Sequence, residues 1–156
     1  MKYEIERIFL VKKDVWEKLK KPEGHFYRQG YISTEPEKTI RVRVADGKAF
    51  LTFKGISTGA KRLEYEYEIP VSDANEMLDE FTSVTIAKVR YVVEFGNKQW
   101  EVDVFEGDNE GLIVAELELE EEDEVFELPE WVGMEVTGDA RYYNSSLVEK
   151  PFKSWG

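Results

Sequence analysis

The residues of this sequence that could do chemistry are charged side chains spaced two apart. Glu4 and Glu6 form one such pair near the amino terminus, and Arg41 and Arg43 form another. Alternate side chains of a β-strand share a face, so the members of each pair would stand side by side. Like charges at that spacing repel by roughly 1 kcal/mol in water, and by several where solvent is thinned. A strand face built in this way indicates bound counterions or a ligand.

The same alternation of charged and apolar residues returns further along the chain, at residues 64–68, 88–90, 101–103 and 116–119. A solvated face is common in antiparallel sheets and explains one such stripe, but it explains six of them less well. Acids and bases also lie on separate stretches. We therefore expect a sheet rolled so that acidic strands face basic strands across a polar lumen.

Each charged residue taken singly has a simpler interpretation. A lone acid is more often part of a solvated strand face than a metal ligand, so the acid pairs gain weight only if they share a lumen. Arg41 and Arg43 could form salt bridges to Glu64 and Glu66 instead of binding a ligand. We expect both roles to coexist in an empty tunnel.

The composition limits the classes of partner. The 156 residues are expected to form a single domain, 1–156, large enough to bury a core. The 33 acids outnumber the 21 bases, and the resulting charge of −12 repels nucleic acids and anionic membranes at long range. A local basic cluster can still bind a small anion. The absence of cysteine excludes disulfides and cysteine-ligated zinc.

The sequence also carries an expectation about location. It shows no secretory signal, and no apolar run approaches the ~20 residues of a membrane span. We therefore expect a cytoplasmic protein with neither a membrane nor a nucleic acid as partner. Monomer and homodimer both remain open.

Eight extended stretches are expected to carry the charged residues. The dipeptides Asp46-Gly47 and Gly96-Asn97 are typical of two-residue hairpin turns, so the strands on either side of each should be antiparallel neighbours. Closing eight strands removes exposed edges and leaves room for a small ligand. The predicted fold is mainly β, an eight-stranded antiparallel closed barrel with a charged lumen and a few outer helices. The expected strands are residues 2–11, 25–33, 39–44, 49–54, 60–70, 85–95, 98–105 and 112–119.

Three short helices are expected beside the sheet. Asp14 is the expected N-cap of the first. Ser72 and Asp73 would open the second, whose apolar stripe includes Ala74 and Phe81 and can lie on the outside of the sheet. Residues 139–148 could form the third.

Several motifs, taken in chain order, resemble those of the CYTH superfamily, the triphosphate tunnel metalloenzymes. The resemblance covers almost the whole chain. Each motif alone is weak, but the ordered set is specific. It rests on EIER at 4–7, QGY at 29–31, RVR at 41–43, LTFKG at 51–55, EYE at 64–66, KVRY at 88–91, WEVDVFEG at 100–107, AELE at 115–118, and EVTGD at 135–139 followed by Arg141 and Tyr142.

The resemblance implies a tunnel that hydrolyses inorganic tripolyphosphate with Mg²⁺ or Mn²⁺. The implied metal ligands are Glu4, Glu6, Glu116 and Glu118, and the implied phosphate-binding residues are Arg41, Arg43, Lys54, Lys88 and Arg90. The implied catalytic residues are Glu6, Lys54, Lys88, Glu116 and Glu118, and the implied supporting residues, which would orient the bases or a second metal ion, are Glu64, Glu66, Glu101 and Asp103. These residue types suit the chemistry, because hard cations prefer carboxylate oxygen and phosphoryl transfer depends on positioning and charge stabilisation.

One position departs from the family pattern. The family motif on the first strand is Glu-x-Glu-x-Lys, and Ile8 stands where the lysine would be. An aliphatic side chain can neither donate a hydrogen bond nor carry charge. Lys12, Lys61 or Arg141 could supply the missing charge, although Lys61 and its neighbour Arg62 are expected at a strand start in solvent.

Other functions stay open on the sequence alone. Ile8 motivates a non-catalytic barrel that binds polyphosphate or nucleotides. The substrate could also be an organic triphosphate such as thiamine triphosphate or a nucleoside triphosphate, or ATP as in the class IV adenylyl cyclases. A carrier of apolar ligands would require Val42 and Val44 to face the lumen.

Overall fold

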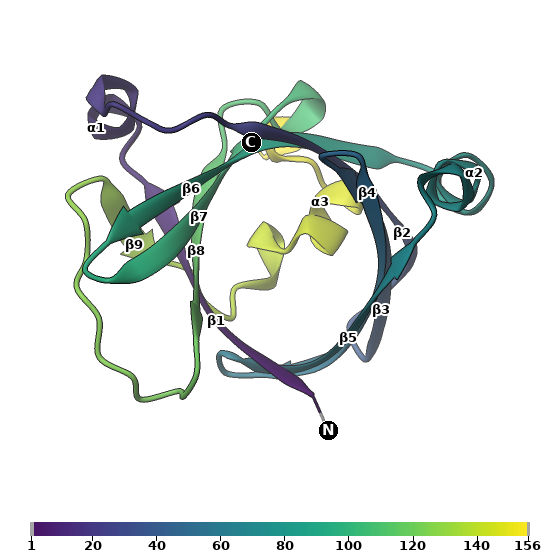
Figure 1. Cartoon of the computed structure of the whole chain (residues 1–156), viewed down its shortest axis with the longest axis horizontal. Coiled ribbons are helices and arrows are strands. Elements are labelled where there is room, and N and C mark those ends of the chain that lie inside the picture. Colours follow the sequence, from purple (N-terminus) through teal and green to yellow (C-terminus); the bar gives the residue numbers. More distant parts are fainter. Residues whose placement is uncertain (1, 156) are drawn as a thin grey trace.

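The computed structural model describes residues 2–155, which form one antiparallel sheet closed into a ring (Figure 1). The strands follow the order β5-β4-β3-β2-β6-β7-β8-β1-β9, and β5 also pairs with β1. The predicted closed ring of eight strands is confirmed, and β9 is an additional strand outside it. The strands are β1 (Tyr3–Val11), β2 (His25–Glu35), β3 (Lys38–Ala45), β4 (Lys48–Thr58), β5 (Lys61–Ile69), β6 (Thr85–Phe95), β7 (Lys98–Phe105), β8 (Ile113–Leu119) and β9 (Val132–Glu135).

The ring closes along one edge of β1, which meets three different segments of the chain. Its first residues pair with β5 and its last residues pair with β9. Between them, the Glu6 N–H donates to the Ala60 carbonyl at 2.9 Å, and the Ile8 N–H donates to Thr137 Oγ1 at 2.8 Å. The carboxy-terminal segment therefore completes the wall beside Ile8. The sequence pattern missed β9 because its four residues show no alternation of charge.

The two predicted hairpin turns are present and fix the register of the charged strands. Asp46 and Gly47 have φ angles of 51° and 72°, and Gly96 and Asn97 have φ angles of 59° and 62°. Positive φ at both central residues is the geometry of the tight hairpin turn. The first turn places Lys54 opposite Thr39, on the same face as the arginines of β3.

Helix α1 (Lys13–Lys18) covers one apolar part of the outer face of the ring. Trp16 packs edge-on against Trp131 with their ring centroids 5.4 Å apart, and Trp131 packs against the fully buried Trp100 at 5.7 Å. Because the inner faces of these strands carry charges, the apolar side chains must pack outside the ring, and a helix must cover them.

Helix α2 (Val71–Phe81) covers a second apolar part of the outer face. Ala74 and Leu78 pack against Val42 and Ala49. Val42 is therefore buried outside the lumen, which rules out the apolar carrier. Phe81, which was expected on the same stripe, is 64% exposed because it is the last residue of the helix.

The predicted helix starts were wrong by one or two residues. Helix α1 begins at Lys13 with Lys12 as its cap residue, so Asp14 lies in the first turn. Helix α2 begins at Val71 directly after Pro70. Neither cap residue makes a side-chain hydrogen bond, and the acids of the first turn instead lie near the positive end of each helix. No helix within residues 2–155 is both long and apolar enough to cross a membrane.

The predicted helix at residues 139–148 is interrupted. A 3₁₀ turn (Ala140–Tyr142) is followed by Tyr143 in an extended conformation and then by α3 (Asn144–Glu149). In Figure 1, α3 lies across the opening of the ring. Two further 3₁₀ turns occur at Gly107–Asn109 and Phe152–Ser154.

The carboxy-terminal segment brings an apolar plug to one end of the lumen. Tyr142 and Leu147 pack with Ile8, Ile86 and Val114, which come from the inner faces of β1, β6 and β8. The same inner faces carry charged residues further along each strand. The lumen is therefore charged over part of its length and apolar where the carboxy-terminal segment enters it.

Candidate active site

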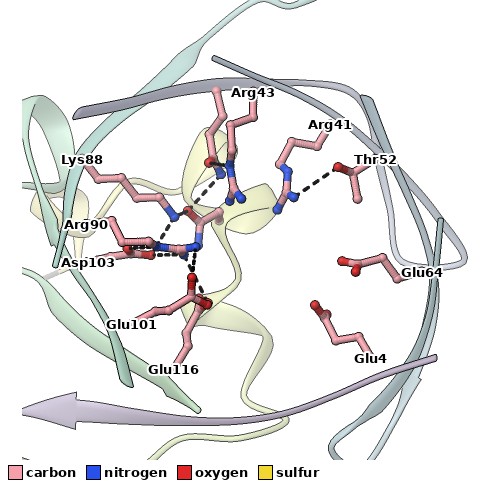
Figure 2. A network of polar contacts seen from close by, with 12 residues as sticks. Glu4, Arg41, Arg43, Thr52, Glu64, Lys88, Arg90, Glu101, Asp103 and Glu116 are labelled. Atoms are coloured by element: carbon pink, nitrogen blue, oxygen red, sulfur yellow. Dashed lines mark hydrogen bonds and ion pairs between the residues drawn. The ribbon is translucent and has the colours of Figure 1, made fainter. Parts of the chain in front are cut away.

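A cavity of about 240 Å³ lies inside the ring and is lined mainly by charged side chains (Figure 2). The sequence-predicted site residues that line it are Glu4, Glu6, Arg41, Arg43, Lys54, Glu64, Glu66, Lys88, Arg90, Glu101, Glu116 and Glu118. Asp103 is the exception, because it is fully buried behind the lining. The structure therefore brings together residues that are up to 114 positions apart, from Glu4 to Glu118.

The strand order separates the charges into two halves. Strands β5, β1, β8 and β7 are consecutive around the ring and carry the lumen acids, whereas β4, β3 and β6 carry most of the bases. Figure 2 shows Arg41 and Arg43 across the lumen from Glu4 and Glu116, with Lys88 beside Arg90 and Asp103. The predicted arrangement of acidic strands facing basic strands is thus present.

Asp103 anchors two of the bases. It accepts hydrogen bonds from Lys88 Nζ at 2.7 Å and from Arg90 Nε and Nη2 at 2.7 and 2.9 Å. Burial alone would raise the pKa of Asp103, but the charges and hydrogen bonds of Arg90 and Lys88 outweigh it and hold the pKa well below its usual range. For Lys88, burial outweighs the attraction of Asp103 and, together with Arg90 and Arg43, lowers the pKa to about 7.

Arg90 also connects Asp103 to the acidic half of the cavity. Its Nη1 donates to Glu101 at 2.9 Å and its Nη2 donates to Glu116 at 3.3 Å. Burial still raises the pKa of Glu101 despite this contact. Arg90 is therefore held in one orientation by three carboxylates.

Lys54 bridges two acids of neighbouring strands. Its Nζ lies 2.9 Å from Glu4 Oε1 and 3.4 Å from Glu64 Oε2. Burial and the charge of Glu4 raise the pKa of Glu64 to about 7. Burial would also raise the pKa of Glu4, but Lys54 lowers it below its usual value. A single lysine thus offsets the repulsion between two close carboxylates.

The arginines of β3 differ in their partners. Arg41 Nη2 lies 3.3 Å from Glu66, while the buried Arg41 Nε makes no hydrogen bond within residues 2–155. Arg43 Nε donates to Gln29 Oε1 at 2.9 Å. The predicted salt bridge to β5 is therefore confirmed for Arg41 and wrong for Arg43.

Two acids of the cavity have no partner in the described part of the chain. Glu6 and Glu118 stand directly opposite each other on β1 and β8, and neither carboxylate makes a hydrogen bond or an ion pair within residues 2–155. Burial and the charges of Glu116 and Glu4 raise the pKa of Glu6 well above its usual value. Opposed carboxylates without a counterion are a donor set that suits a hard divalent cation. Within residues 2–155, however, no three acids or histidines are already close enough to form a metal centre.

Sequence reasoning missed two uncharged residues of the network. The buried Gln29 Nε2 donates to Asn144 Oδ1 at 3.1 Å, and Lys88 Nζ donates to the same oxygen at 3.0 Å. Gln29 could have been found from its place between Tyr27 and Tyr31 on an alternating strand. Asn144 lies on α3, and nothing in the sequence indicates that this helix enters the ring.

The charged ring has close relatives among known proteins. A family model described as the CYTH domain matches residues 2–150. The chain belongs to the CYTH domain family. An inorganic triphosphatase of Acetivibrio thermocellus is 52% identical over 153 residues, which are 97% of each chain. An inorganic triphosphatase of Nitrosomonas europaea is 34% identical over 153 residues, covering 93% of this chain and 96% of the relative.

The fold agrees with that assignment. The crystal structure of the inorganic triphosphatase NE1496 superposes with a TM-score of 0.63 and 31% sequence identity, over 92% of this chain and 96% of that chain. The sequence matches and the superposed fold therefore both support membership of the CYTH family.

Ile8 is the position where this CYTH chain departs from the motif of its first strand. It lines the cavity but is only 9% exposed, because it packs into the apolar plug. Lys12, Lys61 and Arg141 were the cations proposed to replace the lysine, and none of the three lines the cavity. Arg141 is instead paired with Asp139. Arg62 does line the cavity, so its expected position in solvent was wrong.

Proposed function

We propose that this protein is an inorganic triphosphatase that hydrolyses tripolyphosphate to phosphate and diphosphate with a divalent metal ion. The observation that carries the proposal is the cavity inside the ring, in which Glu6 and Glu118, two acids without an ion-pair partner among the described residues, face a set of arginines and lysines. Its relatives named inorganic triphosphatase support the same substrate.

The proposed metal ligands are Glu4, Glu6, Glu116 and Glu118, which would hold Mg²⁺ or Mn²⁺. A bound ion of this kind polarises phosphate oxygens and lowers the pKa of its water. Of the four, Glu6 and Glu118 form no ion pair within the described residues. The other two are held by Lys54 and Arg90.

The bases would bind and orient the phosphate chain. Arg41, Arg43 and Arg90 offer planar donors that suit phosphate oxygens, and Lys54 and Lys88 act as point charges. The unbonded Arg41 Nε is a buried donor that a phosphate oxygen would satisfy. A water molecule attacks the terminal phosphorus, the bond from that phosphorus to its bridging oxygen breaks, and diphosphate leaves with that oxygen. The bases would stabilise the negative charge that develops on it.

The supporting acids would set the positions of these bases. Asp103 fixes Lys88 and Arg90, while Glu66 fixes Arg41. Glu64 and Glu101 share the remaining contacts to Lys54 and Arg90. Ion pairs of this kind keep the cations in place before the substrate enters, which lowers the cost of ordering them.

A phosphate-release assay tests the proposal. Purified protein is incubated with tripolyphosphate and either Mg²⁺ or Mn²⁺, with EDTA as the matched control, and the products are separated. Phosphate with diphosphate is the expected result. Release from thiamine triphosphate or ATP at a higher kcat/KM would assign an organic substrate, and cyclic AMP with diphosphate would assign a cyclase. No metal-dependent release from any of them would refute the proposal.

A second candidate function rests on Ile8. A chain that binds polyphosphate without turning it over would show tight calorimetric binding of tripolyphosphate with metal and no product. The buried, uncharged side chain at this position is the specific observation in its favour. The turnover assay and the titration, run on one protein sample, separate the two functions.

Metal binding should release protons. The pKa of Glu6 lies well above its usual value because of burial and the neighbouring Glu116, so this carboxyl keeps its proton to a higher pH than an ordinary glutamate, and a metal ion must displace that proton. The apparent affinity for Mn²⁺ should therefore rise with pH until Glu6 is ionised. Calorimetric titration in two buffers of different ionisation enthalpy, repeated over a series of pH values, measures the proton release. Equal binding enthalpies in the two buffers would contradict it.

Ile8→Lys should increase kcat/KM for tripolyphosphate by about ten- to a hundredfold, the equivalent of one charge-assisted contact. The register places position 8 opposite Glu116, and the lumen face places it beside Glu6, so the added cation has two acids to pair with. Its alkyl stem can keep part of the apolar packing. Ile8→Leu is the matched control and should behave like the unaltered protein. A well-folded Ile8→Lys variant with unchanged or lower kcat/KM would contradict the prediction.

A further inference from the structure

Arg62 is an arginine of the cavity wall whose charge meets no carboxylate. It stands near the start of β5, directly opposite Glu4 on β1. Its Nε donates to the Gly55 carbonyl, and its Nη2 donates to Thr39 Oγ1 at 2.8 Å and weakly to the Pro36 carbonyl at 3.4 Å. All three acceptors are uncharged. Within residues 2–155, Arg62 forms no ion pair.

The other cations of the cavity, with one exception, are already paired. Lys54, Arg41, Lys88 and Arg90 each contact at least one carboxylate. A phosphate oxygen that approaches one of these cations must compete with an existing ion pair. The exception is Arg43, whose one side-chain hydrogen bond within residues 2–155 goes to an amide oxygen. Among the cavity cations of the described residues, Arg43 and Arg62 are therefore the two that form no ion pair.

The guanidinium of Arg62 is held in a defined orientation with donors to spare. Its central carbon lies 5.7 Å from the centre of the Tyr143 ring, which comes from the carboxy-terminal segment. Two of its nitrogens are anchored by hydrogen bonds, and Nη1 makes none to any residue that the structure describes. An arginine carries five N–H donors in a planar fork. The Nη1 donors thus remain for a ligand, while the anchored side of the fork fixes where they point.

The bulge in β4 explains why this arginine is held in place. The pairing of β4 with β5 shifts between Lys54 and Ser57, so the Gly55 carbonyl is free to accept a bond from a side chain. Arg62 also shares its strand face with Glu64, two residues on. The same alternation that placed Glu64 in the lumen therefore places Arg62 there.

We propose that Arg62 binds a phosphate group of the substrate chain, as an additional substrate-binding residue on the acidic side of the cavity. This inference rests on the proposed function, because it takes a linear polyphosphate as the ligand. The cation on β5 would contact the chain from the half of the ring that otherwise carries acids. Substrate would then be held from both sides, by Arg62 on one and by Arg43 on the other.

Arg62→Gln tests the proposal by removing the charge while keeping a hydrogen-bonding side chain. The dissociation constant of tripolyphosphate, measured calorimetrically without metal, should increase by about ten- to a hundredfold, the range of a charge-assisted hydrogen bond. KM should rise in parallel. Arg62→Lys keeps the charge and should recover most of the affinity. Lys61→Gln is the matched control, because Lys61 is the neighbouring residue, lies over the ring of Tyr3 and does not line the cavity.

A merely structural role would give a different pattern. If Arg62 only ties β5 to its neighbours, Arg62→Gln would lower the melting temperature and leave the dissociation constant and KM unchanged, which would overturn the proposal. If Arg62→Gln does not fold, the side-chain Nε resonance of Arg62 in ¹⁵N-labelled protein is followed instead, with Arg62→Lys to assign it. Saturating tripolyphosphate should shift that resonance, and an unmoved resonance would equally overturn the proposal.

The experiment separates this inference from the proposed function. Unaltered protein that binds tripolyphosphate through Arg62 but releases no phosphate would refute only the hydrolysis. Unaltered protein that hydrolyses tripolyphosphate, with Arg62→Gln binding it normally, would refute only the role of Arg62.

Discussion

Glu6→Gln should abolish metal-dependent phosphate release and leave the fold intact. Substituting a residue that hydrogen-bonds to a metal ligand typically lowers metal affinity or activity about 10- to 100-fold. Removing the charge of a ligand itself should therefore reduce kcat/KM by more than about a hundredfold. Glu118, directly opposite, should behave in the same way. Glu122→Gln, in the exposed acidic run after β8, is the matched control and should retain full activity.

The same substitution should not destabilise the metal-free protein. The pKa of Glu6 is raised in the folded state. Its contribution to stability is therefore fully present below the pKa of the unfolded chain, and it is lost as the pH rises through the pKa of the folded protein. A glutamine does not titrate, so Glu6→Gln should equal or exceed the unaltered protein in melting temperature, with the gain increasing toward alkaline pH. Retained turnover in well-folded Glu6→Gln would remove β1 from the metal site.

Asp103→Asn should cost about 3–5 kcal/mol of unfolding free energy, the usual effect of breaking a buried ion pair from one side. The substitution removes the fully buried charge between Lys88 and Arg90 and turns one acceptor into a donor that faces them. Urea unfolding at pH 7 measures the loss. Asp108→Asn, at an exposed position beyond the end of β7, is the control and should change little.

The stability that Asp103 contributes should also depend on pH in a defined direction. Arg90 and Lys88 hold its pKa below the usual range, against the effect of burial. The contribution to stability is therefore present above the pKa of 3.8 that the unfolded chain would have, and it is lost as the pH falls below that pKa. The difference in unfolding free energy between the unaltered protein and Asp103→Asn should therefore shrink in acid. A constant difference from pH 7 to strongly acidic conditions would show that the carboxylate charge is not what stabilises the core of the site.

The two substitutions act on different parts of the charged network and should be distinguishable by what they change. Glu6→Gln alters metal dependence with the bases in place. Asp103→Asn releases Lys88 and Arg90, so it should weaken tripolyphosphate binding even without metal. This contrast follows from their side-chain partners, because within residues 2–155 the Glu6 carboxylate has none and Asp103 has two cations.

The sequence by itself determined which residues face the lumen. Strand alternation placed Glu4, Glu6, Arg41 and Arg43 on inner faces, and the turn at Asp46-Gly47 fixed the register that adds Lys54. These are local properties, set by the period of a strand and by the φ angles of two residues. The closed ring of eight strands followed from the same pattern and from the family resemblance.

Only the tertiary structure decided which charges are paired and which remain available. Arg43 meets Gln29 because the pairing of β3 with β2 places the two residues directly opposite each other, whereas Glu66 is aligned through Thr52 with Arg41. The entry of α3 into the lumen, which brings Asn144 to Lys88, depends on contacts between residues more than 50 positions apart. Arg62 shares the alternation of its neighbours, but its guanidinium is held in the cavity by tertiary contacts, with the Gly55 carbonyl at the bulge in β4, with Thr39 and with the ring of Tyr143. Local periodicity fixes the direction of a side chain, whereas its partners are fixed by packing that is distant in sequence.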